Sequence, residues 1–430
     1  MQSEIPADLT PAVRIHEYML LMRELSRQTD PEQLLRSYRA RAQFVVPGDH
    51  FISLSRKDLS DGRVRITRTT RWDEPINPWK EPERLPMIDR GILCDLMRVA
   101  HPVKIDNLEL ADDDPARPYF EGMHSALAAP IFHEGDPTYM VVMLRARPAA
   151  FTLDELATLL LTANLIGRAA SNLVMADELR KAYAALDREM HQVGEIQRSL
   201  LPAAPPDVPG LRVATYYETS TRAGGDYYDF LRIDDTHWGF LIADVSGHGP
   251  PAAVVMAMTQ AFMRSPAAAA PDDPALPSRW LARVNGDLFR SLRRGQFVTA
   301  FLGVLDTRSR EFSFASAGHP APRLVRPRQH EVVPLKSDAG LPLGIVDQHE
   351  SRPQRLVLSP GERLLLFTDG ITEAFNDRHE MFGTEGVDDA LRRCSITPDS
   401  MIQCVLTDLR AHQPAGQLQD DRTLVALAFD

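Results

Sequence analysis

Apolar residues near the start of the chain recur at intervals of three and four positions. Between Pro11 and about Val45 this spacing includes Ile15, Tyr18 and Met22, and it is typical of amphipathic helices. Shorter apolar runs follow, separated by loops rich in proline and acidic residues, and they predict β-strands. These runs are residues 51–54, 64–67, 127–132 and 139–144. We therefore expect the first part of the chain to be a mixed α/β unit.

A long segment without proline follows, from Thr152 until Pro202. Thr152 and Glu155 have the spacing of a capping box, and a helix of about 50 residues would be about 75 Å long. From Ala176 to Leu200 apolar positions alternate at three and four, which predicts the seam of a parallel two-stranded coiled coil. Packing of this seam onto a domain of the same chain is the alternative. The seam is interrupted near its end by Gly194 and Gln197.

Composition and charge narrow the classes of protein to which the chain can belong. Its 430 residues carry a formal net charge of −11, which repels phosphate backbones, so no nucleic-acid partner is expected. The first residues include acids and prolines where a signal peptide needs a basic start, and the longest apolar stretch, residues 156–166, is too short to span a bilayer. The 3 cysteines have no spacing typical of a zinc site or a disulfide framework. We expect a cytoplasmic protein with no membrane segment.

The order of elements in the first part resembles a GAF domain. A first helix precedes a central antiparallel sheet with the phrase SALAAPIF, and MVVMLRARPAAFTLDEL then leads into a final helix. The resemblance implies a small-molecule ligand or a role in dimerisation and relay alone, and both stay open. We predict a GAF-like α/β sensor domain at 1–165, a helical coiled-coil linker at 166–205 and a catalytic domain at 206–430. A homodimer through the linker helix is expected.

Acidic residues in the last part of the chain lie where apolar runs begin or end. AGGDYYDF has two glycines, which let backbone approach a ligand closely, directly before Asp226. A buried strand is expected to carry Asp244 at its tip, followed by a tight turn and a helix over 250–263 that starts with proline. ERLLLFTDGITEA ends a strand at Asp369, and QDDRTLVALAF places Asp420 in a doublet before the last strand. One such aspartate is usually a turn former, but four are hard to explain as turns.

These acids predict a particular chemistry. Clustered carboxylates raise each other's pKa unless cations neutralise them. Oxygen ligands without an organised histidine or cysteine partner favour Mn²⁺ or Mg²⁺. Two such ions, about 3.5 to 4 Å apart, can bridge one water, lower its pKa and polarise a phosphoryl oxygen. The acids therefore predict hydrolysis of a phosphate ester, and the lack of a lysine in a glycine-rich phosphate loop argues against a kinase or P-loop NTPase.

At these residues the sequence closely resembles the metal-dependent Ser/Thr protein phosphatases, the type-2C or PPM family, in the bacterial branch that regulates sigma factors and sporulation. The phrases that carry the resemblance are, in order, EIQRSLLP, GGDYYDF, DVSGHGPPAA, FVTAFLGVLD, ASAGHPAPRL, LPLGI, LLLFTDGITEA and DDRTLV. The resemblance implies an α+β fold in which a β-sandwich flanked by helices holds the acids at one end. It also implies hydrolysis of phosphoserine or phosphothreonine by metal-activated water, without a covalent enzyme intermediate. The substrate implied is a phosphorylated anti-sigma-factor antagonist or a similar small regulatory domain.

The same resemblance assigns ligands to two Mn²⁺ or Mg²⁺ ions. The aspartate of the DVSGHG phrase bridges the ions, and the carbonyl of the next residue lies beside it. The first acid of the final doublet is the expected ligand there. The implied set is Asp226, Asp244, the carbonyl of Val245, Asp369 and Asp420.

The roles of several neighbouring residues stay open. Asp421 is the second choice for the last ligand. Many eukaryotic members have a histidine two residues after the bridging aspartate, as a proposed general acid, but this chain has Ser246 there, so protonation of the leaving group by a side chain is in doubt. His248 and His319 are candidates for contacting phosphate or a metal-bound water, with a structural loop role as the stronger expectation. Arg222 could clamp a phosphate, although a solvated surface arginine is the better prediction.

Two other functions remain possible. A pseudophosphatase scaffold would be marked by a lost metal ligand, and no ligand is lost here. Hydrolysis of a nucleotide second messenger is compatible with the acids alone. For the phosphatase, we expect the helix from Thr152 to Leu201 to relay the state of the sensor domain to the catalytic domain.

Overall fold

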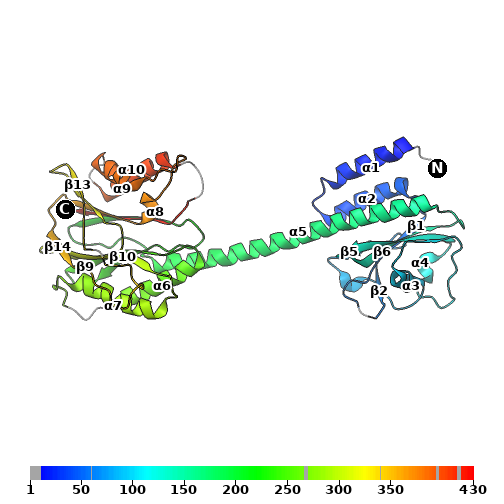
Figure 1. Cartoon of the computed structure of the whole chain (residues 1–430), viewed down its shortest axis with the longest axis horizontal. Helices are drawn as coiled ribbons and strands as arrows, with labels where there is room; N and C mark the ends of the chain where they lie inside the picture. Colours follow the sequence, from blue (N-terminus) through cyan, green and yellow to red (C-terminus); the bar gives the residue numbers. More distant parts are fainter. Residues whose placement is uncertain (1–10, 60, 266–269, 339, 394–396, 414–417) are drawn as a thin grey trace. The chain divides into compact units, whose positions relative to one another are not determined.

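The structure is a computed structural model that describes residues 11–59, 61–265, 270–338, 340–393, 397–413 and 418–430. The chain divides into two units, Met1–Tyr183 and Ala184–Asp430. The boundary falls within the longest helix, α5 (Leu153–Leu200), which contributes residues to both units (Figure 1). The predicted bounds of sensor, linker and catalytic parts stay predictions.

The N-terminal unit is built around a six-stranded sheet with the order β3-β2-β1-β6-β5-β4, in which neighbouring strands are antiparallel. Its strands are β1 (His50–Ser55), β2 (Val64–Thr69), β3 (Met87–Ile88), β4 (Val103–Ile105), β5 (Ser125–His133) and β6 (Asp136–Arg145). Its other helices are α1 (Pro11–Leu25), α2 (Pro31–Val45), α3 (Ile92–Val99), α4 (Arg117–Phe120) and the short 3₁₀ helix η1 (Pro82–Arg84). The four predicted strands and the opening helices are confirmed. Assignment to the GAF class stays a prediction.

The two faces of this sheet are covered by different helices. Along β6, alternate side chains point to opposite faces, so Met140 and Val142 join the core beneath α3 and α4. Val141 and Met143 instead pack beside buried residues of α5. Figure 1 shows α2 and the first part of α5 along one face of the sheet and α3 and α4 on the other.

The long helix begins as its sequence predicts. The Glu155 N–H donates to Thr152 Oγ1 at 3.2 Å, and the Thr152 N–H donates to Glu155 Oε2 at 2.8 Å, which completes a capping box. Within the described residues, α5 is the one helix with the length and apolar composition to cross a membrane, with a window of mean hydropathy 1.3 that is 28% buried. Such a helix is weak evidence for a membrane segment, because soluble core helices pass the same test. Here Leu159 and Ile166 are buried in the N-terminal unit.

The C-terminal unit contains two five-stranded sheets, with the orders β14-β11-β10-β9-β8 and β13-β12-β15-β16-β7. Its strands are β7 (Leu211–Glu218), β8 (Tyr227–Arg232), β9 (His237–Val245), β10 (Val298–Asp306), β11 (Glu311–Ala317), β12 (Arg323–Arg326), β13 (Glu331–Pro334), β14 (Gln354–Val357), β15 (Arg363–Phe367) and β16 (Arg422–Phe429). Its helices are α6 (Pro250–Met263), α7 (Leu276–Ser291), α8 (Asp369–Thr372), α9 (Gly383–Arg393) and α10 (Pro398–His412).

The two sheets pack face to face between helical layers. Ile242 of β9 and Phe301 of β10 share one buried apolar cluster with Leu364 of β15. Helices α6 and α7 cover the first sheet, and α9 and α10 cover the second (Figure 1). The structure therefore has the β-sandwich flanked by helices that the resemblance implied, and the helix predicted over 250–263 is confirmed.

The cysteines depart from the expectation drawn from their spacing. Cys94 is a buried free thiol, but Cys404 of α10 is disulfide-bonded. The spacing of cysteines along the chain does not show which of them come together in space.

Candidate metal centre

The four predicted ligand side chains lie at one end of the sandwich. Asp226 precedes β8, and Asp244 lies near the end of β9. These two strands pair antiparallel, so both acids lie at the same end of the first sheet. Asp369 follows β15 and Asp420 lies just before β16, which pair in the same way in the second sheet. Electrostatic repulsion from the other three acids and from Asp421 acts on Asp244, so the structure brings the predicted set together.

Glycines allow the backbone segments at this end to approach one another. A Cβ on Gly225 would lie 2.7 Å from the carbonyl oxygen of Val245, and one on Gly370 would lie 1.9 Å from the carbonyl oxygen of Asp421. A Cβ on Gly224 would lie 2.2 Å from Asp421 Oδ2. The two glycines before Asp226 were expected to let backbone approach a ligand; in the structure they lie against protein atoms, and the approach to a ligand stays a prediction.

Two threonines hold the most deeply buried acid of the cluster. Asp226 is 1% exposed, and its Oδ2 accepts hydrogen bonds from Thr368 Oγ1 at 2.8 Å and from Thr423 Oγ1 at 2.6 Å. Thr368 directly follows β15 and Thr423 lies within β16, both in the second sheet, so these bonds tie the Asp226 loop across the sandwich. The sequence analysis missed both threonines, because only the fold brings them beside Asp226.

The two acids of the final doublet have different surroundings. Asp421 is buried, its Oδ1 accepts the Ser220 N–H at 2.7 Å, and its Oδ2 accepts the Gly225 N–H at 2.6 Å. Asp420 is exposed and accepts the N–H of Asp421 at 2.8 Å. Asp421 is thus occupied in holding the backbone of the Asp226 loop, which leaves Asp420 as the acid with freer oxygens.

Electrostatics favour a cation at this cluster. Burial, and then repulsion from Asp226 and the other acids, raises the pKa of Asp244 to about 10. Burial, and then repulsion from Asp420, raises the pKa of Asp369 to about 6. Burial also raises the pKa of Asp226 and of Asp420. Between residues that the structure describes, none of the ion pairs involves these four acids.

The donor chemistry of the cluster fits a hard divalent cation, because all of its donors are carboxylate or carbonyl oxygens. A positive ion would also relieve the repulsion that raises these pKa values. Across the described ranges, no three histidine, cysteine or acidic side chains converge closely enough to form a ligand shell by themselves. The fit therefore rests on the chemistry and charge of the donors.

The polar residues beside the cluster have mostly structural contacts. Ser246, in the place of the eukaryotic histidine, accepts the Phe297 N–H at 2.9 Å. His248 is exposed and lies near enough to Asp420 to oppose the rise in the pKa of that acid, which burial dominates. His319 Nδ1 lies 2.8 Å from Thr299 Oγ1, and burial lowers the pKa of His319 to about 3, so its ring is neutral. These contacts favour a structural role for His319.

Two further charged residues are engaged in ion pairs. Arg222 Nε lies 3.0 Å from Asp187 Oδ1 of α5, and both side chains are about half exposed, which agrees with a solvated surface arginine. Asp229, the second acid of GGDYYDF, is buried and accepts from Tyr227 Oη at 2.6 Å and from Arg264 Nε at 2.7 Å. Asp229 thus anchors α6 to β8 and lies outside the ligand cluster.

The end of α5 packs directly on the loop that carries Asp226. Gln197 is 4% exposed, its Nε2 donates to the Gly224 carbonyl at 2.6 Å, and its Oε1 accepts the Gly224 N–H at 2.8 Å. A Cβ on Gly194 would lie 1.9 Å from the carbonyl oxygen of Arg222. Gly194 and Gln197 were interpreted as weak points of a coiled-coil seam; in the structure both pack against the loop before Asp226, and the coiled coil stays a prediction.

Comparison with known proteins finds similarity in this unit to a protein family and to solved structures. Residues 234–430 match the family described as "Stage II sporulation protein E (SpoIIE)". Asp244, Asp369 and Asp420 lie within the matched residues, and Asp226 lies shortly before them. The solved SiaA-PP2C domain of Pseudomonas aeruginosa has the same fold, with a TM-score of 0.50 and 22% identity over 59% of this chain and 100% of that domain. The matched family covers less than half of the chain and the solved domain shows the fold alone, and both agree with a protein serine/threonine phosphatase in the C-terminal unit.

Within that class the chain is similar to two proteins of Bacillus subtilis (strain 168). It is 27% identical to phosphoserine phosphatase RsbU over 254 residues, which cover 58% of this chain and 72% of RsbU. It is 28% identical to phosphoserine phosphatase RsbP over 191 residues, which cover 43% of this chain and 45% of RsbP. The match to RsbP therefore spans less than half of that relative.

Proposed function

We propose that this chain is a sensor-regulated, metal-dependent phosphatase that hydrolyses phosphoserine or phosphothreonine on a regulatory protein. The observation that carries the proposal is the gathering of Asp226, Asp244, Asp369 and Asp420 at one end of the sandwich, with raised pKa values. These side chains and the Val245 carbonyl would hold two Mn²⁺ or Mg²⁺ ions. When bound, such ions lower the pKa of a water and polarise the phosphoryl oxygen.

The residues of the chain supply placement for this reaction. Hydrogen bonds from Thr368 and Thr423 fix the orientation of the Asp226 carboxylate. Asp421 fixes the backbone of the same loop through the Gly225 N–H. Ser246 is engaged with the backbone of Phe297, so it does not replace the general acid of the eukaryotic enzymes. Solvent, or the exposed His248, is left to protonate the leaving group.

The proposed substrate is a phosphorylated anti-sigma-factor antagonist or a similar small regulatory protein in the cytoplasm. The resemblance carried by the motif phrases supports this choice, and the similarity to RsbU and RsbP, both named phosphoserine phosphatases, supports a phosphoserine substrate. The formal charge of −11 agrees with a protein substrate rather than a nucleic acid.

The proposal is tested by turnover of a phosphoserine protein by the purified full chain in Mn²⁺, in Mg²⁺ and in EDTA. We expect turnover that requires a metal and that Asp244→Asn abolishes. Asp235→Asn is the matched control, because Asp235 is an exposed acid of the same unit that pairs with Arg232. Metal binding without turnover would indicate a pseudophosphatase, and turnover of cyclic nucleotides alone would indicate a second-messenger hydrolase. Undiminished turnover in EDTA would refute the metal mechanism.

We further propose that the N-terminal unit is a GAF-like sensor and that α5 carries its state to the catalytic unit within a homodimer. Support for relay comes from the bonds between Gln197 of α5 and Gly224 beside Asp226. Support for dimerisation comes from the exposed apolar side chains of Leu179, Tyr183 and Leu186 on α5. A regulator must bind two arrangements with different affinity, and each tenfold shift needs about 1.4 kcal/mol.

The regulatory proposal is tested by comparing the full chain with a chain that starts at residue 151 and one that starts at residue 211. The last truncation removes Gln197 and so also tests its contact with the catalytic loop. Equal turnover by all three chains, with and without cell extract, would show that the N-terminal half does not regulate the phosphatase.

A further inference from the structure

A cavity of about 280 Å³ lies in the N-terminal unit, on the side of the sheet that carries α2 and α5. Its walls come from α2, β1, β2, β6 and the segment after β2, with Leu159 contributed by α5. The cores beneath α3 and α4 belong to the opposite face of the sheet. The volume lies just below the range of about 300 to 1,000 Å³ for drug-sized ligands, so the cavity suits a small molecule.

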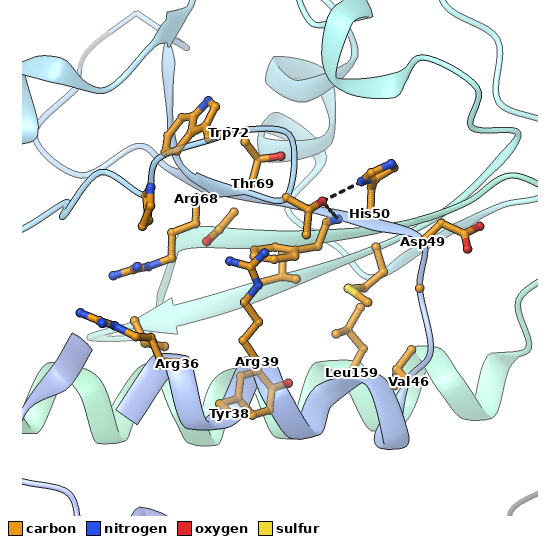
Figure 2. A pocket seen from close by; sticks show the side chains of 18 of the residues that line it. Arg36, Tyr38, Arg39, Val46, Asp49, His50, Arg68, Thr69, Trp72 and Leu159 are labelled. Carbon is orange, nitrogen blue, oxygen red and sulfur yellow. Dashed lines mark hydrogen bonds between the residues drawn. The ribbon is translucent and has the colours of Figure 1, made fainter. Parts of the chain in front are cut away.

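Arginines line one end of the cavity, and apolar side chains lie with Asp49 and His50 toward the other. Figure 2 shows Val46 and Leu159 at one end, Arg36 and Arg68 at the other, and Arg39 rising from α2 between them. The alternation of β6 places Val141 in the same wall. A ligand that satisfies both ends must have an apolar body and an anionic group.

The charges around the cavity leave one guanidinium available. Arg68 is occupied, because its Nη1 and Nη2 donate to the two carboxylate oxygens of Glu32 at 2.9 Å and 2.6 Å. Arg36 Nε lies 3.8 Å from the same carboxylate. Arg39 lies over the ring of Phe51 at 5.2 Å, and within the described part of the chain it has no acidic partner.

The two acids that line the cavity do not cancel this charge. Glu32 is shared between Arg68 and Arg36. The Oδ2 of Asp49 accepts the Ala146 N–H at 2.8 Å and is turned to that loop. Arg39 therefore keeps a positive charge on the lining that no acidic side chain of the described residues pairs with, which matches an anionic group on the ligand.

We propose that this cavity binds a small organic monocarboxylate whose apolar body lies against Val141 and Leu159 and whose carboxylate pairs with Arg39. The planar guanidinium presents two parallel donors to a carboxylate, and the ring of Phe51 supports it from one face. Leu159 belongs to α5, the helix that also carries Gln197, so an occupant would contact the proposed relay element. The binding itself does not depend on the proposed phosphatase activity.

The test is titration calorimetry of the full chain with octanoate. We expect saturable binding of octanoate, weaker binding of butyrate, which has the same head group, and weaker binding of 1-octanol, which has the same tail. Arg39→Gln should weaken octanoate binding about tenfold or more, because a hydrogen-bonded charge contributes about 1.5 to 3 kcal/mol. Arg39→Lys should give an intermediate loss, because it keeps the charge but not the paired donors.

Arg98→Gln is the matched control, because Arg98 lies on α3 outside the cavity, is exposed and pairs with Asp95 at 2.8 Å. It should leave the affinity for octanoate unchanged. Three results would overturn the proposal: no saturable binding of octanoate at millimolar concentration, equal loss in Arg39→Gln and Arg98→Gln, or equal affinity for octanol and octanoate.

Discussion

Replacing Gly194 by alanine sets two physical effects of opposite sign against each other. Alanine within a helix is favoured over glycine by about 1 kcal/mol, so helix propensity alone predicts a more stable protein. The new Cβ, however, would lie 1.9 Å from the carbonyl oxygen of Arg222 and 3.0 Å from its carbonyl carbon. These are backbone atoms, so no flexible side chain can move aside.

The net effect can be estimated from the contacts of the loop. Overpacking of this kind costs about 1 to 3 kcal/mol. A shift of Arg222 also strains the two bonds between Gln197 and Gly224, each of which contributes about 1 kcal/mol. After the gain in helix propensity, Gly194→Ala should lose about 2 to 4 kcal/mol of unfolding free energy in the C-terminal unit. Turnover and metal affinity should fall with it, because Asp226 follows the displaced loop.

The assay is urea unfolding followed by tryptophan fluorescence. The chain has 4 tryptophans, and changing Trp72 and Trp79 to phenylalanine leaves Trp238 and Trp280, which report on the C-terminal unit. The matched control is Gly286→Ala in α7, where the new Cβ would meet only Arg290 Nη1 at 3.5 Å.

The control should be more stable than the parent by up to about 1 kcal/mol. A Gly194→Ala protein that is as stable as the parent, or that is stabilised like the control, would show that α5 does not pack tightly on the loop before Asp226.

Three further predictions concern charge and assembly. Burial, and then the adjacent acids, raises the folded-state pKa of Asp369 to about 6, above its ordinary value. In EDTA, the free energy of unfolding should therefore fall as pH rises from about 4 to 6. Asp369→Asn should make this fall shallower, as measured by urea unfolding. Asp229→Ala should lower the unfolding free energy by about 1 to 3 kcal/mol, because it leaves the buried Tyr227 hydroxyl without its acceptor, whereas Arg264 is half exposed and stays solvated; an unchanged calorimetric transition would show these bonds to be dispensable. Leu179→Asp with Leu186→Asp should give monomers by light scattering, because both side chains are more than half exposed; a parent chain that is already monomeric at micromolar concentration contradicts the dimer.

The strands and the acids at their ends could be predicted from the sequence because both are local signals. A run of apolar residues that stops at an aspartate, as in LLLFTD before Gly370, marks a strand end wherever the strand lies. Antiparallel pairing then gathers such ends at a common edge. The two glycines before Asp226 predicted that other atoms approach the backbone closely there, but the sequence did not show which atoms these are.

The supporting contacts could not be predicted because they join residues far apart in the chain. Thr423 lies 197 positions from Asp226, and Arg264 lies 35 from Asp229. Neither spacing has a local signature. Gln197 is the clearest case, because a polar residue in an apolar seam is indistinguishable in sequence from a coiled-coil defect until its partner, Gly224, is known.

The continuity of α5 has a consequence for how the chain can vary in length. A helix turns by about 100° for each residue. Inserting or deleting one residue between Leu186 and Gln197 would therefore rotate the exposed apolar side chains of α5 by about 100° about the helix axis, relative to the contact between Gln197 and Gly224. A change of seven residues restores the direction to within about 20°. Natural or engineered variants should therefore tolerate length changes in this segment in steps of about seven residues and lose activity or assembly in the intermediate steps.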